Sequence, residues 1–190
     1  MNLPNTITLG RILLVPAVVW AIGADEMALA FWLFLLAGVS DAVDGFIAKR
    51  FGLATELGAY LDPLADKALL VSIYVTLAHA GVLPLWLAIA VVARDIMIVG
   101  AVLLSWVLDK PVPIRPLIVS KLNTTAQIGF AAFLLAAQGF GFVPGGAQEV
   151  GVLLVGALTA GSALAYLVDW ARHMKPSGDG KGEDRAKDGR

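Results

Sequence analysis

The chain has 190 residues, of which 58% are hydrophobic and 15% are charged, and its mean hydropathy is +0.80. This composition excludes an ordinary soluble domain and indicates a polytopic membrane protein. The absence of cysteine excludes disulfides and thiolate metal sites. The net charge of −1 points to no class of partner, and we expect no nucleic acid.

Six hydrophobic stretches are long enough to cross a bilayer, which takes about 20 mostly apolar residues. We predict transmembrane helices at about 7–23, 27–50, 59–80, 84–108, 119–139 and 147–172. Asn5 or Thr6 is suited to cap the first of them. The predicted fold class is therefore all-α, with a six-helix transmembrane domain over 1–174. The polar, mixed-charge segment 175–190 is predicted to be a disordered cytoplasmic tail.

The basic residues predict the orientation of these helices. The connections after the first, third and fifth helices contain no Lys or Arg. Those after the second and fourth contain Lys49, Arg50, Lys110 and Arg115, and the tail from Arg172 holds six of the fourteen basic residues. Cytoplasmic loops are enriched in Lys and Arg. We therefore predict an integral protein of a bacterial-type inner membrane with both termini, and the connection between helices two and three, in the cytoplasm.

Helices two and three carry four aspartates near their predicted cytoplasmic ends. Asp41 and Asp44 are three residues apart, and Asp62 and Asp66 are four apart, so each pair shares one helix face. A carboxylate at the centre of a bilayer costs roughly 2.5–3.5 kcal/mol, so such residues usually have a function. Clustered carboxylate oxygens are the ligands that Mg²⁺ and Mn²⁺ prefer. We predict a metal site, the alternative being helix caps and solvated loop acids.

These aspartates belong to a longer pattern, D-x2-D-G-x2-A-R-x8-G-x3-D-x3-D. The stretch resembles the signature of the CDP-alcohol phosphotransferases (CDP-alcohol phosphatidyltransferases), integral membrane enzymes of phospholipid synthesis. Seven of its eight fixed positions match, at Asp41, Asp44, Gly45, Ala48, Gly58, Asp62 and Asp66. The eighth is Lys49, where the family usually has Arg. Lysine keeps the positive charge but lacks the bidentate fork of a guanidinium.

The resemblance implies a reaction and a role for each signature residue. In the family, an alcohol attacks the β-phosphorus of a CDP-alcohol and CMP is released. Asp66 matches the general base that takes the proton of the acceptor hydroxyl. Two ions, Mg²⁺ or Mn²⁺, are implied on the metal ligands Asp41, Asp44, Asp62 and Asp66. The implied nucleotide-binding positions are Gly45, Ala48, Lys49 and Gly58.

Four basic residues outside the signature are predicted to bind the phosphate of an acidic acceptor or, in the case of Arg11, either that phosphate or the nucleotide. Arg11 closes an N-x2-T-x2-R segment similar to one that opens many relatives. Arg94 lies beside Asp95 inside the fourth predicted helix, where charged side chains usually face the interior of a bundle. Arg115 precedes the segment SKLNTTAQ, which contains Lys121 and resembles an acceptor-side segment of phosphatidylglycerophosphate synthases and CMP-forming cardiolipin synthases. The alternatives are a structural ion pair for Arg94 and positive-inside anchors for the other three.

The resemblance favours CDP-diacylglycerol as donor and phosphatidylglycerol as acceptor, which is cardiolipin synthesis. Glycerol 3-phosphate, the acceptor of phosphatidylglycerophosphate synthases, is the alternative. A hypothesis from another class is a divalent-cation transporter whose ion path uses the aspartates. The regularly spaced Gly151, Gly156 and Gly161 of the sixth helix permit close packing and favour a homodimer.

Overall fold

The computed structural model describes residues 3–51, 56–107 and 118–174, and within these ranges all regular secondary structure is helical. The helices are α1 (Leu3–Gly23), α2 (Met27–Phe51), α3 (Glu56–His79), α4 (Leu85–Val107), α5 (Ile118–Phe140) and α6 (Gly146–Met174). The all-α prediction is confirmed. The predicted tail, 175–190, and Arg115 lie outside the described residues.

The helix bounds differ from the predicted ones mainly at the N-terminal ends of two helices. Helix α1 begins at Leu3 and α3 at Glu56, where the hydrophobic pattern had placed their starts at about 7 and 59. Hydropathy marks the apolar part of a helix, whereas backbone hydrogen bonding continues into polar turns beside it. The proposed caps were therefore wrong, because Asn5 and Thr6 lie inside α1.

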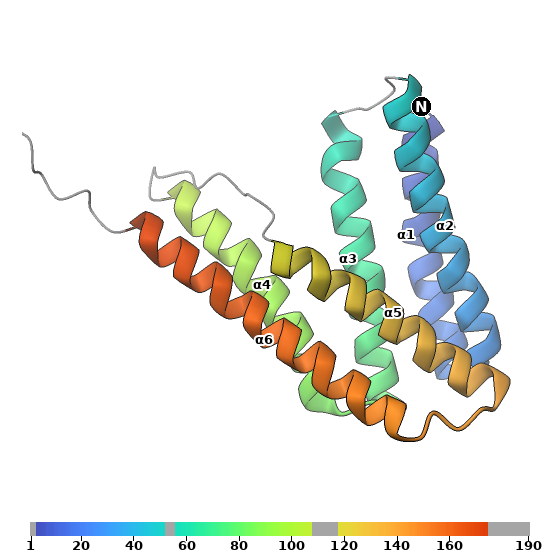
Figure 1. Ribbon diagram of the computed structural model, residues 1–190. Helices are drawn as coiled ribbons and strands as arrows, with labels where there is room; N and C mark the ends of the chain where they lie inside the picture. Colours follow the sequence, from blue (N-terminus) through green and yellow to red (C-terminus); the bar gives the residue numbers. More distant parts are fainter. Residues whose placement is uncertain (1–2, 52–55, 108–117, 175–190) are drawn as a thin grey trace, which may run out of the picture.

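The helices form two groups joined by α5. In the described residues, α1 packs against both α2 and α3, and α4 packs with α6. Figure 1 shows the second pair inclined to the first group, with α5 crossing between them. Helix α5 contacts α2, α3 and α6, and α3 also contacts α4. The centre of the molecule is thus built where α3 and α5 meet the other helices.

Glycines allow the closest approaches between helices. A Cβ atom added at Gly139 of α5 would lie 2.6 Å from the backbone nitrogen of Ala28 in α2. One added at Gly151 would lie 2.2 Å from the Phe130 ring, and one at Gly156 would lie 2.8 Å from the Trp86 ring. Two of the three glycines predicted for a dimer seam are therefore occupied by packing within the chain.

Large apolar side chains cover much of the outer surface. Leu13, Trp20, Ile96, Leu153 and Leu164 are each more than 60% exposed. Such broad apolar exposure is unusual for a soluble monomer and indicates association with a membrane. By length and composition, Ile118–Phe140 and Gly146–Ala171 qualify as membrane spans, while Gly10–Gly23 and Met27–Val43 are shorter apolar stretches. A topology with six spans stays a prediction.

Candidate active site

A cavity of about 510 Å³ lies among helices α1 to α5. Its polar lining comes from all five of these helices and includes Arg11, Asp41, Asp66, Lys67, Asp95 and Gln127. Its apolar lining includes Phe31, Phe34, Leu35, Leu70, Ile128 and Ala132. Phe34 precedes Asp41 by seven residues on α2, or about 10 Å at the helical rise of about 1.5 Å per residue. The cavity therefore changes along α2 from carboxylates to an apolar wall.

Arg11 joins the two signature helices at the polar part of this cavity. Its Nη1 donates a hydrogen bond to Asp66 Oδ1 over 2.8 Å, and its Nη2 lies 2.9 Å from Asp41 Oδ1. The arginine is 1% exposed, whereas both carboxylate side chains are 46% exposed. A buried guanidinium needs such carboxylates, because an unpaired buried charge is strongly destabilising. The first and last aspartates of the signature are thus brought to one cation.

The hydrogen-bonding capacity of Arg11 is only partly used. Its Nε and Nη2 are buried and have no hydrogen-bond acceptor among the described side chains, although Nη2 is close enough to Asp41 for an ion pair. Buried donors without acceptors are rare in folded proteins. Arg11 is therefore placed to meet a further anionic group at this site.

The other signature residues are placed by backbone only. Asp44, Ala48 and Lys49 lie in α2, and Gly58 and Asp62 lie in α3, but their side chains are outside the described part of the structure. The i, i+3 spacing in α2 and the i, i+4 spacing in α3 put Asp44 and Asp62 on the same helix faces as Asp41 and Asp66. At Gly45, no atom of the described residues lies within 4 Å of an added Cβ, so the described surface there is open.

Asp41 and Asp66 fit one side of a divalent-cation site. They come from different helices, point at the same guanidinium and are half exposed. Carboxylate oxygen is the donor that Mg²⁺ and Mn²⁺ prefer. Among the side chains that the structure describes, no three His, Asp or Glu residues are grouped closely enough to hold a metal ion. The remaining two aspartates of the signature belong to the part whose side chains are not described.

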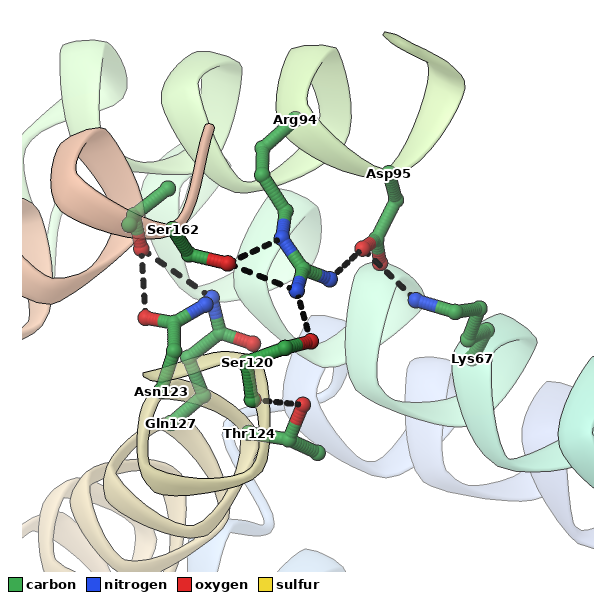
Figure 2. A network of polar contacts seen from close by, with 9 residues as sticks. Lys67, Arg94, Asp95, Ser120, Asn123, Thr124, Gln127 and Ser162 are labelled. Carbon is green, nitrogen blue, oxygen red and sulfur yellow. Dashed lines mark hydrogen bonds and ion pairs between the residues drawn. The ribbon is translucent and has the colours of Figure 1, made fainter. Parts of the chain in front are cut away.

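A second polar network lies between α4, α5 and α6 (Figure 2). Arg94 is 4% exposed, and its Nε and Nη2 donate to Ser162 Oγ over 3.2 and 2.9 Å. Nη2 also donates to Ser120 Oγ, and Nη1 donates to Asp95 Oδ1 over 2.5 Å. The Tyr166 ring centroid lies 5.8 Å from the guanidinium carbon, a cation–π distance. All three guanidinium nitrogens of Arg94 are engaged within the protein.

Asp95 links this network to the cavity. Lys67 Nζ lies 2.6 Å from the same Oδ1 atom that accepts from Arg94. Asp95 and Lys67 line the cavity, but Arg94 does not. Figure 2 shows Asp95 between the two cations, with Lys67 on the neighbouring helix.

Two of the predicted acceptor residues, Lys121 and Arg94, lie away from the cavity lining. Lys121 is exposed on α5 and is not among the lining residues, whereas Thr124 and Gln127 of the same helix are. Below them, Thr159 Oγ1 donates to Asn123 Oδ1 over 3.0 Å and accepts from Gln127 Nε2 over 3.1 Å. Helix α5 therefore contributes neutral polar side chains, Thr124 and Gln127, to the cavity lining.

The sequence pattern of the family described as CDP-alcohol phosphatidyltransferase matches residues 1–167. The chain belongs to this family. The resemblance drawn from the aspartate signature is confirmed, and Asp41 and Asp66 of that signature meet at Arg11.

Relatives in the CDP-alcohol phosphatidyltransferase family carry two kinds of name. The chain is 31% identical to "Probable cardiolipin synthase (CMP-forming)" of Drosophila melanogaster over 89% of its own length and 58% of that protein. It is 32% identical to "Cardiolipin synthase (CMP-forming)" of Homo sapiens, over 87% of the chain and 60% of that protein. The chain thus spans about three fifths of the length of these two relatives.

A bacterial relative is matched over more of its length. It is the "CDP-diacylglycerol--glycerol-3-phosphate 3-phosphatidyltransferase" of Bacillus subtilis, 33% identical over 70% of this chain and 76% of that protein. The names of both enzyme types considered for this chain therefore occur among its relatives.

Sequence reasoning missed Lys67 and Asp95 as site residues. A signal was present, because adjacent positions on a helix point about 100° apart. Arg94 and Asp95 therefore could not both face the same neighbouring helix. Asp95 could consequently reach a second cation on another helix. Lys67 follows Asp66 directly, which is the position that the family signature marks as the base.

Proposed function

We propose that the chain transfers a phosphatidyl group from CDP-diacylglycerol to a hydroxyl acceptor and releases CMP. The observation that carries this proposal is the cavity in which Asp41 and Asp66 face one end of an apolar wall. A diacyl donor with a charged diphosphate needs both surfaces next to each other. Membership of the CDP-alcohol phosphatidyltransferase family supports the same reaction.

The chemical step makes one bond and breaks one. The acceptor oxygen attacks the β-phosphorus, which carries the diacylglycerol, and the bond from that phosphorus to the oxygen of CMP breaks. CMP leaves with the electron pair of that bond, and the Asp66 carboxylate takes the hydroxyl proton. Arg11 holds Asp66 in place through the 2.8 Å hydrogen bond.

The four signature aspartates are proposed to hold two Mg²⁺ or Mn²⁺ ions, with Asp41 and Asp66 supplying the ligands described above. Bound there, the ions would offset the negative charge of the diphosphate and of the departing CMP. Arg11 has two buried nitrogens, Nε and Nη2, without a hydrogen-bond acceptor in the described part of the chain, which supports a contact with a phosphate oxygen of a bound substrate.

The nucleotide is proposed to lie over the cytoplasmic turns of α2 and α3. The backbone at Gly45 is open, so a nucleotide can approach it closely. Ala48 and Gly58 are further proposed positions of close approach, and Lys49 is proposed to contact the phosphates. These turns face the cytoplasm in the orientation predicted from the basic residues, which gives a soluble nucleotide access.

For the acceptor, we propose phosphatidylglycerol, so that the product is cardiolipin. The names of the fly and human relatives support this choice. Glycerol 3-phosphate is the second candidate, because the chain matches 76% of the Bacillus subtilis protein named for that acceptor. Arg115 and Lys121 are proposed to attract either anion to the cytoplasmic face, and a homodimer stays a prediction.

The proposal is tested with the purified full chain in detergent, with CDP-diacylglycerol and Mg²⁺ or Mn²⁺. Phosphatidylglycerol and glycerol 3-phosphate are offered separately, and products are identified by mass spectrometry. Cardiolipin with CMP is the expected result, and phosphatidylglycerophosphate with CMP supports the second candidate. Folded protein that releases no CMP with either acceptor contradicts the proposal. In that case, a cation flux in liposomes would favour the transporter hypothesis.

A further inference from the structure

Lys67 is the more accessible of the two cations among the described residues that line the cavity. Its side chain is 42% exposed, whereas Arg11 is 1% exposed and lies between two carboxylates. The Lys67 ammonium therefore has room to contact a ligand in the cavity. Arg11 can contact such a ligand only through its buried Nε and Nη2.

The ion pair of Lys67 does not fully neutralise its positive charge. Its partner Asp95 is 13% exposed and is shared with Arg94, so two cations divide one carboxylate. Arg94 is itself fixed by the hydroxyls of Ser120 and Ser162. The group of Arg94, Asp95 and Lys67 thus carries one excess positive charge, and its exposed member is Lys67. A charge-assisted hydrogen bond to a phosphate oxygen is stronger than a bond between neutral groups.

Asp66 and the adjacent Lys67 contact different helices. Asp66 contacts Arg11 of α1, and through it Asp41 of α2, the helix that carries three of the four proposed nucleotide positions. Lys67 contacts α4 instead, through Asp95. If Asp66 takes the proton of the acceptor hydroxyl, the acceptor approaches it from the side that α2 does not occupy.

We propose that Lys67 binds the phosphate of the acceptor, a phosphorylated glycerol, and that Asp95 and Arg94 position it. This assignment rests on the proposed function and deepens it. It gives Arg94 a role through Asp95 and Lys67, in place of the direct phosphate contact expected from the sequence. Asp95 acts as a positioning residue because it holds the ammonium at the cavity wall without contacting the substrate.

The test compares Lys67→Met and Lys67→Arg with the unaltered chain, with phosphatidylglycerol and glycerol 3-phosphate as separate acceptors. Lys67→Met is expected to raise the KM of the accepted anion roughly tenfold, the size of a lost charge-assisted hydrogen bond. The KM for CDP-diacylglycerol should stay within about twofold, and Lys67→Arg should recover most of the loss because it keeps the charge. The acceptor whose KM rises in Lys67→Met is the one that carries the phosphate bound by Lys67.

Asp95 is tested through a double-mutant cycle, because a positioning residue acts only while Lys67 is present. Asp95→Asn is expected to raise the same KM by roughly three- to fivefold, and to add nothing to Lys67→Met. Thermal unfolding in detergent verifies that each variant is folded.

The outcomes separate the two proposals. If the unaltered chain releases CMP but Lys67→Met leaves the acceptor KM unchanged, the assignment of Lys67 is wrong while the proposed function stands. The same holds if Lys67→Met raises the KM of donor and acceptor equally. An unaltered chain that is folded and releases no CMP overturns the proposed function, and the assignment of Lys67 with it.

Discussion

Arg11 Nη1 lies 2.8 Å from Asp66 Oδ1, so the first helix holds the residue proposed as the base. The same guanidinium lies 2.9 Å from Asp41, and it is the buried member of the cluster. Two carboxylates held close together repel each other unless a cation lies between them. In the described structure, that cation is Arg11.

This arrangement predicts that metal ions stabilise a variant without the arginine more than they stabilise the unaltered chain. In Arg11→Gln, Asp41 and Asp66 lose their shared cation, so Mg²⁺ becomes the remaining source of positive charge. Because both carboxylates are half exposed, the loss of stability without metal should be modest, about 1–2 kcal/mol. Thermal unfolding in detergent is measured with chelator and with Mg²⁺, and Arg11→Lys serves as the charge-keeping control. Equal metal-induced shifts in Arg11→Gln and the unaltered chain would show that Arg11 does not neutralise this site.

Asp66→Asn is predicted to abolish most of the transfer activity while the fold is kept. The amide still accepts a hydrogen bond from Arg11 but cannot take a proton from the acceptor, and general-base catalysis is typically worth about 10²–10⁴-fold. Release of CMP is measured by mass spectrometry, and far-UV circular dichroism checks the helices. A fall of less than about tenfold in folded protein would assign the base to another residue.

The aspartate cluster was predictable because its geometry is local. The spacing of the four aspartates fixes their helix faces. The short connection between α2 and α3 predicts direct packing of these two helices, but in the described residues each of them packs against α1 instead. The role of Arg94 was not predictable in the same way. Its partners Ser120 and Ser162 lie 26 and 68 residues away, and only the packing of α4 and α5 against α6 brings them to Arg94. Asp95, one position on, consequently faces the cavity.

Gly38→Leu is predicted to impair the use of CDP-diacylglycerol by narrowing the cavity. Gly38 lines the cavity on α2 between Phe34 and Asp41, and no atom lies within 4 Å of an added Cβ. A leucine there has room to fold but occupies space that the lipid needs, and we expect kcat/KM for the long-chain donor to fall roughly tenfold, about 1.4 kcal/mol. Gly129→Leu is the matched control, because Gly129 is exposed on α5 and does not line the cavity. Equal losses of kcat/KM in the two variants would show that the donor does not bind in this cavity.

Gly139→Ala is predicted to destabilise the fold although it adds a single methyl group. The new Cβ would lie 2.6 Å from the Ala28 backbone nitrogen and 2.7 Å from its Cα, so α2 and α5 must move apart. A backbone atom cannot rotate away as a side chain can, and overpacking of this kind costs about 1–3 kcal/mol. Gly129→Ala is the matched control on the same helix, because its Cβ meets nothing within 4 Å and alanine favours a helix by about 1 kcal/mol over glycine. Thermal unfolding in detergent should therefore show a lower Tm for Gly139→Ala and an equal or higher Tm for Gly129→Ala. An unchanged Tm for Gly139→Ala would mean that α2 and α5 are not in backbone contact at this point.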